Sequence, residues 1–515
     1  MSRPSWLLLC ILLGGRTLQP VCAAEPPTDW LDRIDLRDLK RHASFLASDT
    51  LEGRQAGARG GQAAAAYLVS ELKRLGLSPA GSGGDYRQSF GTQYCNVLAQ
   101  RTGADPDRRG DLIVIGAHYD HVGFGNASNS YGPFGVIHNG ADDNASGVAA
   151  LLEVAQALAH ADMAPARTIV FAFWDGEEVA LLGSQHWVSS VPPQAVKLAV
   201  NLDMIGRLRS EGVQIMGWRS AAGLRTELAR ANLDERLPFE FGYAVTPDSD
   251  HFSFYRQRIP VLHFDTGKHP DYHRPSDDVE HLNWEGLQSI ARVVARLIVQ
   301  SANADQLPAF RHEAFRETVP AARSVTERRS PPVRFGFTWR SSRIKEGIVE
   351  IDQVVPGLPA AQIGLQPGDR LLRFGRWEQG TLDELRTEIT TAPTTVTVAW
   401  QRPGVSVPMT ASVELHGEPV RWGADCRTDP ALPGCLVVTA VTETSPADRL
   451  GLLPQDVVLS VDDRPASESE WRTLPTFRHP FTLTLERSGQ MRQLTANAQL
   501  TVKSQRPLGS NAVMP

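Results

Sequence analysis

An apolar run that ends in His-Tyr-Asp, LIVIGAHYD at residues 112–120, decides the fold of the first three fifths of this sequence. Six consecutive apolar residues predict a strand that is covered on both faces, as in a parallel sheet flanked by helices. Working outward, strand-like runs at 168–173, 198–202 and 260–264 alternate with helix-like stretches at 146–160, 180–189, 221–232 and 284–300, and residues 30–76 have a helical pattern. This alternation predicts an α/β fold with a mostly parallel sheet between layers of helices.

The composition is that of a globular protein with several domains. The 515 residues are 42% hydrophobic and 21% charged, and the formal net charge is −6. A chain of this length suggests about two to four domains. No block rich in Lys and Arg stands out, so neither nucleic acid nor an anionic membrane surface is an expected partner.

Residues 1–24 predict an export signal. Arg3 is followed by the apolar run 6–13 and then by small residues around Ala24, the order of a cleavable signal peptide. The run is too short to span a bilayer, so we expect no membrane span and a periplasmic or extracellular location. A lipid anchor at Cys22 is the alternative, although Val21 before it is bulkier than such sites usually allow.

Three cysteines lie beyond the signal. An oxidising compartment permits disulfides, and only Cys426 and Cys435 are close in sequence, so we expect these two to pair. Cys95 stands alone in a strand-like run, where a small buried hydrophobic residue is the expected role.

The character of the chain changes after residue 303. Residues 304–333, rich in Arg, Pro and Ala, indicate a linker, and beyond them PAAQIGLQPGD at 359–369 recurs as PADRLGLLPQD at 446–456. Strand-like runs flank both copies, and the repeated block resembles tandem PDZ domains. The expected organisation is a signal, an α/β domain, a linker, two β-rich PDZ-like domains and a tail, at residues 1–24, 25–303, 304–333, 334–417, 418–503 and 504–515.

The two copies differ in the loop that corresponds to the carboxylate-binding loop of PDZ domains. Arg334-Phe-Gly-Phe337 resembles that loop, and Arg421-Trp-Gly-Ala424 departs from it. The first copy is therefore the expected place for a peptide ligand.

Five segments of the α/β region hold histidine and acidic residues where strands end. In open α/β sheets, ligands bind outside the carboxyl ends of the strands. One such segment alone would more often be a cap or a solvated group, but five at the ends of strands of one sheet indicate a common site. Histidine with carboxylates and without cysteine suits catalytic zinc. The segments are His118–Asp120, Gly140–Gly147, Asp175–Glu178, Asn201–Gly206 and Asp271–Ser276.

Taken in order, these segments resemble the secreted di-zinc aminopeptidases, whose wider superfamily includes glutamate carboxypeptidase and glutaminyl cyclase. The resemblance runs from about residue 39 to about residue 298. It implies that Asp143 bridges two zinc ions. It also implies that His118 and Asp203 complete one zinc site, and that Glu178 and His273 complete the other.

The resemblance also assigns the remaining roles. Glu177 would be the general base, and Asp120 would hold the ring of His118, from which it is two residues away. Tyr243 is the candidate donor to the oxyanion, and Asp250 is a candidate residue of the substrate pocket. All the expected ligands precede residue 277, so the C-terminal repeat is not expected to contact metal.

The function implied is hydrolysis of the N-terminal peptide bond of peptides or proteins with a free N terminus, with two zinc ions per subunit. A single-zinc glutaminyl cyclase is the nearest alternative, and metal stoichiometry would separate the two. A carboxypeptidase is less favoured, because it should carry a basic cluster for the substrate carboxylate and the sequence shows no such cluster. A receptor-like peptide-binding scaffold should have lost ligands, and all five expected ligands are present.

Overall fold

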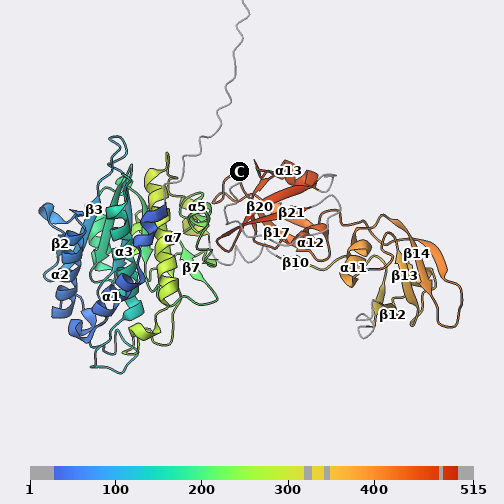
Figure 1. The fold of residues 1–515 in the computed structure, drawn as a ribbon, viewed down its shortest axis with the longest axis horizontal. Helices are drawn as coiled ribbons and strands as arrows, with labels where there is room; N and C mark the ends of the chain where they lie inside the picture. Colours follow the sequence, from blue (N-terminus) through green and yellow to red (C-terminus); the bar gives the residue numbers. More distant parts are fainter. Residues whose placement is uncertain (1–27, 318–326, 341–347, 475–479, 497–515) are drawn as a thin grey trace, which may run out of the picture.

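The computed structural model describes residues 28–317, 327–340, 348–474 and 480–496 (Figure 1). The expected signal at residues 1–24 and the expected tail at 504–515 lie outside the described residues. Within the described ranges, no helix combines the length and the apolar character that crossing a membrane requires.

Four parallel strands form the centre of a nine-stranded sheet in the first domain, and each was expected from its apolar run. Neighbouring residues of these strands face opposite layers. Ile113 packs with the large helical layer, whereas Val114 packs in the smaller cluster on the other face. In sheet order the strands are β5 (Thr168–Trp174), β4 (Leu112–His118), β6 (Val196–Leu202) and β9 (Val261–Asp265).

The flanks of this sheet correct the expectation of a mostly parallel arrangement. On one side, β3 runs antiparallel to β5 and pairs with β1 and β2. On the other side, β7 runs antiparallel to β9 and β8 pairs with β7. The sheet is therefore mixed, because antiparallel strands extend the parallel centre on both sides. Their bounds are β1 (Ser78–Pro79), β2 (Arg87–Phe90), β3 (Tyr94–Arg101), β7 (Val213–Met216) and β8 (Phe239–Phe241).

Helices cover both faces of the sheet. The larger layer packs around α3 and α7, which contact each other and α1. The smaller layer is made by α4 and α6, whose Trp187 and Phe254 meet Trp174 of β5. The helices of this domain are α1 (Leu36–Leu46), α2 (Arg59–Arg74), α3 (Gly147–His160), α4 (Leu182–Ser190), α5 (Leu224–Ala231), α6 (His251–Arg256) and α7 (Trp284–Asn303).

A five-stranded antiparallel unit follows, with its own apolar core. Its sheet order is the chain order, so β11 and β15 are its end strands. Its elements are β11 (Phe337–Trp339), β12 (Val349–Val354), α10 (Pro359–Gln362), β13 (Arg370–Phe374), α11 (Leu382–Thr391), β14 (Thr395–Gln401) and β15 (Met409–Glu414).

A seven-stranded unit completes the described chain, again around its own core. One of its strands, β10, comes from the segment expected as a linker and pairs in parallel with β17. Its elements are β10 (Glu327–Arg329), β16 (Ala424–Arg427), β17 (Leu436–Thr442), α12 (Pro446–Leu450), β18 (Val457–Val461), β19 (Arg464–Pro465), α13 (Glu468–Thr473), β20 (Phe481–Arg487) and β21 (Gln490–Ala496).

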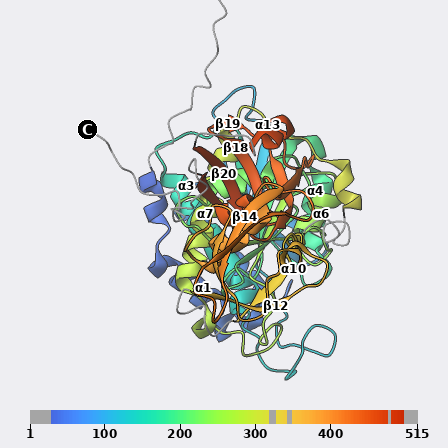
Figure 2. The ribbon, with the colours of Figure 1, turned by 90° about the vertical axis from the view of Figure 1, so that its right-hand side faces the viewer.

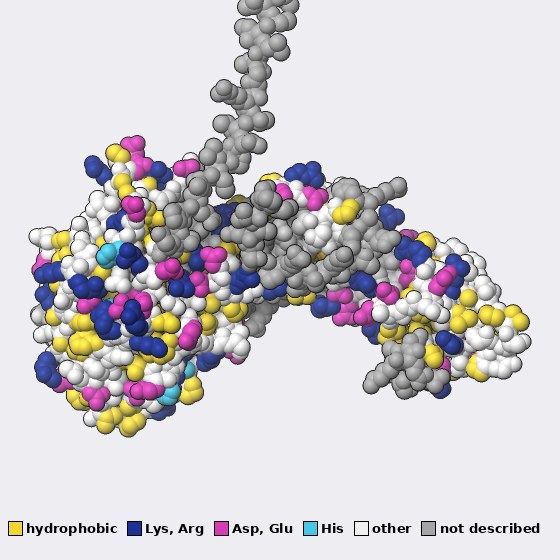
Figure 3. All heavy atoms as spheres, viewed as in Figure 1, with side chains coloured by type: hydrophobic (Ala, Val, Ile, Leu, Met, Phe, Trp, Pro, Cys, Tyr) yellow, Lys and Arg dark blue, Asp and Glu magenta, His cyan; other side chains and the backbone are white. Residues whose placement is uncertain are grey.

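The three units lie in a row, with the seven-stranded unit in the middle (Figures 1 and 2). The middle unit docks on the first domain near α5 and β8. Leu432 and Val457 belong to the same apolar cluster as the first domain's core, and Arg219 donates two hydrogen bonds of 2.9 Å to Asp429. On the face shown in Figure 3, basic and acidic side chains are mixed over the first domain.

The expected disulfide is wrong, because Cys426 and Cys435 are both free thiols in the structure. Cys426 lies on β16 and packs against the core of the seven-stranded unit. Cys435 lies just before β17 and is part of the first domain's apolar cluster. The two cysteine side chains therefore pack in different apolar cores, Cys426 in that of the seven-stranded unit and Cys435 in that of the first domain. Cys95 is half-buried, and burial raises the pKa of its thiol.

Candidate metal centre

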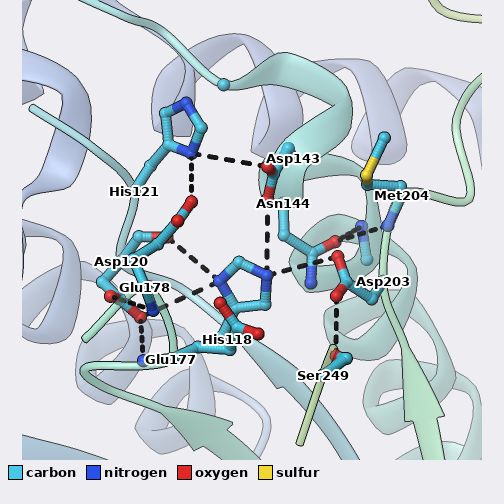
Figure 4. A network of polar contacts seen from close by, with 12 residues as sticks. His118, Asp120, His121, Asp143, Asn144, Glu177, Glu178, Asp203, Met204 and Ser249 are labelled. Carbon is cyan, nitrogen blue, oxygen red and sulfur yellow. Dashed lines mark hydrogen bonds and ion pairs between the residues drawn. The ribbon is translucent and has the colours of Figure 1, made fainter. Parts of the chain in front are cut away.

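The carboxyl ends of the parallel strands bring the expected side chains together (Figure 4). His118 is the last residue of β4, and Asp203 follows β6 directly. Glu177 and Glu178 stand in the turn after β5, and Asp143 lies in the turn Ala141–Ser146 that leads into α3. Because parallel strands end at one edge of the sheet, residues far apart in sequence share one site.

Four side chains form the first group of potential metal donors: His121, Asp143, Glu178 and His273. His273 Nε2 lies 3.0 Å from Asp143 Oδ2 and 3.3 Å from Glu178 Oε1. His121 Nδ1 lies 2.9 Å from Glu178 Oε1 and 3.8 Å from Asp143 Oδ2. Three of the four were expected. His121 was missed, although its position three residues after His118, just beyond the strand, was a usable signal.

The second group comprises His118, Glu177 and Asp203. His118 Nε2 lies 3.2 Å from Asp203 Oδ1 and 3.4 Å from Asp143 Oδ1. Asp143 thus turns one oxygen toward each group, the arrangement required of a carboxylate shared between two cations. The peptide bond between Asp143 and Asn144 is cis.

Asp120 accepts hydrogen bonds from residues of both donor groups. Its backbone carbonyl accepts a hydrogen bond from His118 Nδ1 at 3.1 Å, which leaves Nε2 facing the site. Its buried carboxylate lies farther from that ring, at 3.8 Å, and accepts the backbone N–H groups of Glu177 and Glu178 at 3.1 and 3.3 Å. The strand end and the Glu-Glu turn are therefore tied to one residue.

Asp277 supports the bridging residue. One oxygen of its fully buried carboxylate accepts the backbone N–H groups of Asp142 and Asp143, at 2.9 and 3.0 Å. The other oxygen accepts a hydrogen bond from Arg207 at 3.0 Å. Partners of this kind orient ligands and are often as important as the ligands themselves.

A buried arginine fixes the backbone around the site. Arg54 donates to the backbone carbonyls of Leu46, Tyr119, Asn139 and Gly140. Burial lowers its pKa to about 10, so the guanidinium remains charged at neutral pH. It joins the end of β4 to the turn that carries the bridging carboxylate.

The electrostatics of the site favour a cation. Burial raises the pKa of Glu177 well above its ordinary value, and the nearby carboxylates of Glu178 and Asp203 raise it further. Acidic side chains crowded in a buried site repel one another, and divalent cations would offset that repulsion. Imidazole nitrogens and carboxylate oxygens without thiolates are the donors that catalytic zinc sites use. The residues present therefore fit zinc.

The two substrate candidates are placed differently. Asp250 is buried, and burial raises its pKa to about 7. It adjoins the site through the preceding residue, Ser249, whose hydroxyl donates to Asp203 Oδ2 at 2.6 Å. Tyr243 instead packs edge-on against Trp218 and lines a cavity of about 860 Å³ between the first domain and the seven-stranded unit.

Tyr272 is the tyrosine beside the donor groups. Its ring stacks on His273 with centroids 4.0 Å apart. Burial and the carboxylates of Asp143 and Glu178 raise the pKa of its hydroxyl. A hydroxyl that stays protonated here can donate a hydrogen bond.

A family model and several known proteins are similar to the part of the chain that holds the donor groups. The model of Peptidase family M28 matches residues 96–298, a range that contains both donor groups. Leupeptin-inactivating enzyme 1 of Streptomyces exfoliatus is 31% identical over 192 residues, which cover 36% of this chain and 39% of that protein. Aminopeptidase YwaD of Bacillus subtilis is 27% identical over 217 residues, which cover 38% of this chain and 43% of that protein.

The chain thus spans about two fifths of the length of these relatives. Among solved structures, the LapA aminopeptidase of Legionella pneumophila aligns with a TM-score of 0.46 and 20% identity. That alignment covers 54% of this chain and 75% of the LapA chain.

Proposed function

We propose that this protein is a zinc-dependent aminopeptidase that removes the N-terminal residue of peptides with a free N terminus. The observation that carries the proposal is the pair of donor groups that meet at Asp143, with Glu177 beside them. The match to Peptidase family M28 and the aminopeptidases among the matched relatives support it.

Two zinc ions are proposed because the donors form two sets with a shared carboxylate. His118 and Asp203 would hold one ion, Glu178 and His273 the other, and Asp143 would contribute one oxygen to each. When bound, such a pair of ions supplies Lewis acidity, which makes water a nucleophile near neutral pH and polarises a carbonyl group.

Glu177 is proposed to move the proton. Its backbone N–H is held by Asp120, so the side chain projects from a fixed turn at the edge of the second donor group. From there its carboxylate accepts a proton from the attacking water and delivers it to the leaving amine nitrogen. Proton transfer by a positioned side chain typically contributes about 10²–10⁴-fold to the rate.

The test combines a variant, a substrate pair and metal analysis. Glu177→Gln should lower kcat by about 10²–10⁴-fold while the protein retains two zinc ions per chain. Glu178→Gln is the matched control, because it should lose metal. Wild type should cleave an aminoacyl amide with a free amine and spare its N-acetylated counterpart. Equal cleavage of both substrates would contradict an aminopeptidase, and wild-type turnover in Glu177→Gln would remove its role as base.

The alternative functions have less support. A glutaminyl cyclase needs one zinc ion, whereas the donors here form two adjoining sets. A scaffold without activity should have lost donors. The two relatives described above, a leupeptin-inactivating enzyme and an aminopeptidase, favour neither alternative.

We also propose that the two C-terminal units are PDZ-like and that the first binds peptides. Its end strand β11 lies near α11, where Arg386 sits over the Trp339 ring at 4.9 Å. A peptide can add to such an end strand. In the second unit the Trp471 indole donates to the carbonyl of Ala424 on β16 at 3.2 Å, which occupies a backbone group that a peptide would need.

Export is proposed from the sequence of residues 1–24, with a periplasmic or extracellular location and peptide substrates met outside the cytoplasm. Loss of the first 24 residues from the mature protein, measured by N-terminal sequencing after expression in a bacterial host, is the expected result.

A further inference from the structure

His121 stands among the metal donors without a role in the two-zinc arrangement proposed above. Its side chain is fully buried, and its Nδ1 faces Glu178 and Asp143. Its other ring nitrogen, Nε2, is buried without a hydrogen-bond partner among the described residues. The polar contacts of the imidazole are therefore concentrated at the donor group.

The backbone is built around this ring. The His121 N–H donates to the carbonyl of Arg54 at 3.2 Å, which fixes the main chain just after β4. A Cβ atom at Gly140 would lie 2.5 Å from His121 Cδ2, and the φ of Gly140 is +57°. Both the space and the backbone conformation thus require glycine at this position, which keeps the imidazole beside His273, with ring centroids 5.4 Å apart.

The spacing of the four donor atoms matches one metal ion. In tetrahedral zinc sites the bonds to nitrogen and oxygen are about 2.0–2.2 Å, so neighbouring donor atoms stand about 3.3–3.6 Å apart. The four recorded separations among His121 Nδ1, Glu178 Oε1, His273 Nε2 and Asp143 Oδ2 range from 2.9 to 3.8 Å. They bracket the expected value.

We propose that His121 is a metal ligand through Nδ1, so that the Glu178 site has four protein donors. The other site has three, from His118, Asp203 and Asp143, with Glu177 beside it. The two sites are then unequal. The four-donor site retains its ion more strongly, and the three-donor site keeps more room for water and substrate. This proposal rests on the proposed metal-dependent function.

A separation of 2.9 Å also suits a hydrogen bond from His121 to Glu178, so the experiment must count imidazole ligands. Zinc K-edge X-ray absorption of the full chain loaded with two zinc ions is expected to show three imidazole ligands per pair of ions. His121→Gln should show two. In a chelator titration followed by metal analysis, the last ion of His121→Gln should be released at least about 10–100-fold more readily than that of wild type.

His138→Gln is the matched control. His138 is a buried histidine on the neighbouring segment, and its ring nitrogens already contact Ser130 Oγ at 2.6 Å and the Val136 carbonyl at 2.9 Å. His138 is not among the donor groups, so its substitution should leave the imidazole number unchanged.

Each outcome separates the alternatives. An unchanged imidazole number in His121→Gln overturns the proposal. If the zinc affinity falls although the imidazole number is unchanged, His121 acts by positioning Glu178. If His121→Gln does not fold, the wild-type spectrum decides, because two imidazoles per pair of ions would exclude His121. A wild-type protein that binds no zinc and cleaves no aminoacyl substrate would instead overturn the proposed function.

Discussion

Replacing Asp429 with alanine should loosen the contact between the seven-stranded unit and the first domain. Both oxygens of Asp429 accept hydrogen bonds from Arg219, each 2.9 Å long. The side chains are 2% and 8% exposed, so the pair is shielded from water. Arg219 also donates to Glu317, so it would keep one partner after the substitution.

The magnitude follows from burial. Removing one member of a buried ion pair costs about 3–5 kcal/mol because a buried charge remains without its partner. Since Arg219 keeps Glu317 as a partner, we expect Asp429→Ala to lower the free energy of opening the interface by about 2–4 kcal/mol. At 1.4 kcal/mol per factor of ten, opening of the interface becomes about 30- to 700-fold more frequent.

Hydrogen exchange at two amides measures this opening directly. The N–H of Gly223 donates to Ala431 and that of Phe239 donates to Ser488, so both bonds cross the interface. Their exchange should accelerate by the stated factor in Asp429→Ala. Asp425→Ala is the control, because its ion pair with Arg329 is about half exposed and such pairs contribute at most about 1 kcal/mol. Exchange rates within threefold of wild type in Asp429→Ala would refute the reasoning.

Two further predictions concern Asp277 and Glu317. Asp277→Asn should weaken zinc binding about 10–100-fold, because its carboxylate holds the backbone of Asp143; chelator competition measures this, and unchanged affinity would leave Asp277 without a positioning role. Although burial opposes it, hydrogen bonds from Arg219 and Arg311 lower the pKa of Glu317 to about 2. Because the pKa of Glu317 is lower in the folded state, its ionised carboxylate stabilises the folded protein at pH values above the ordinary pKa of 4.5. This stabilisation is lost as the pH falls toward 2. Urea unfolding at pH 6 and pH 3 should show that loss in wild type, and a smaller one in Glu317→Gln; equal losses would contradict the assignment.

The centre of the fold and most of the candidate site were predictable because they depend on local signals. The run 112–117 is apolar at every position, which a strand buried on both faces explains. Parallel strands end together, so polar residues that follow them must share a site. Six of the seven side chains in the two donor groups follow from this argument.

Other features depend on contacts that no local pattern records. The strands β7 and β8 have four and three residues with mixed polarity, too short for periodicity to separate them from a loop. The position of His121 just after β4 was a signal, but only the folded structure shows that its Nδ1 lies 2.9 Å from Glu178 Oε1. Tyr243 and Tyr272 could not be distinguished without knowing which lies beside His273.

The contacts at the β7–β8 side of the sheet show which of the two C-terminal units packs against the first domain. The strands β7 and β8 extend the sheet beyond its parallel centre, and the seven-stranded unit docks beside them. Phe239 of β8 donates a hydrogen bond to Ser488, and Asn232, which follows α5, donates one to Gly489. Leu432 fills the first domain's core cluster. A chain ending near residue 304 would therefore expose apolar surface and leave Arg219 without Asp429. The five-stranded unit has a separate core and lies beyond the middle unit, so it is the part of the C-terminal region whose removal leaves the first domain's packing intact.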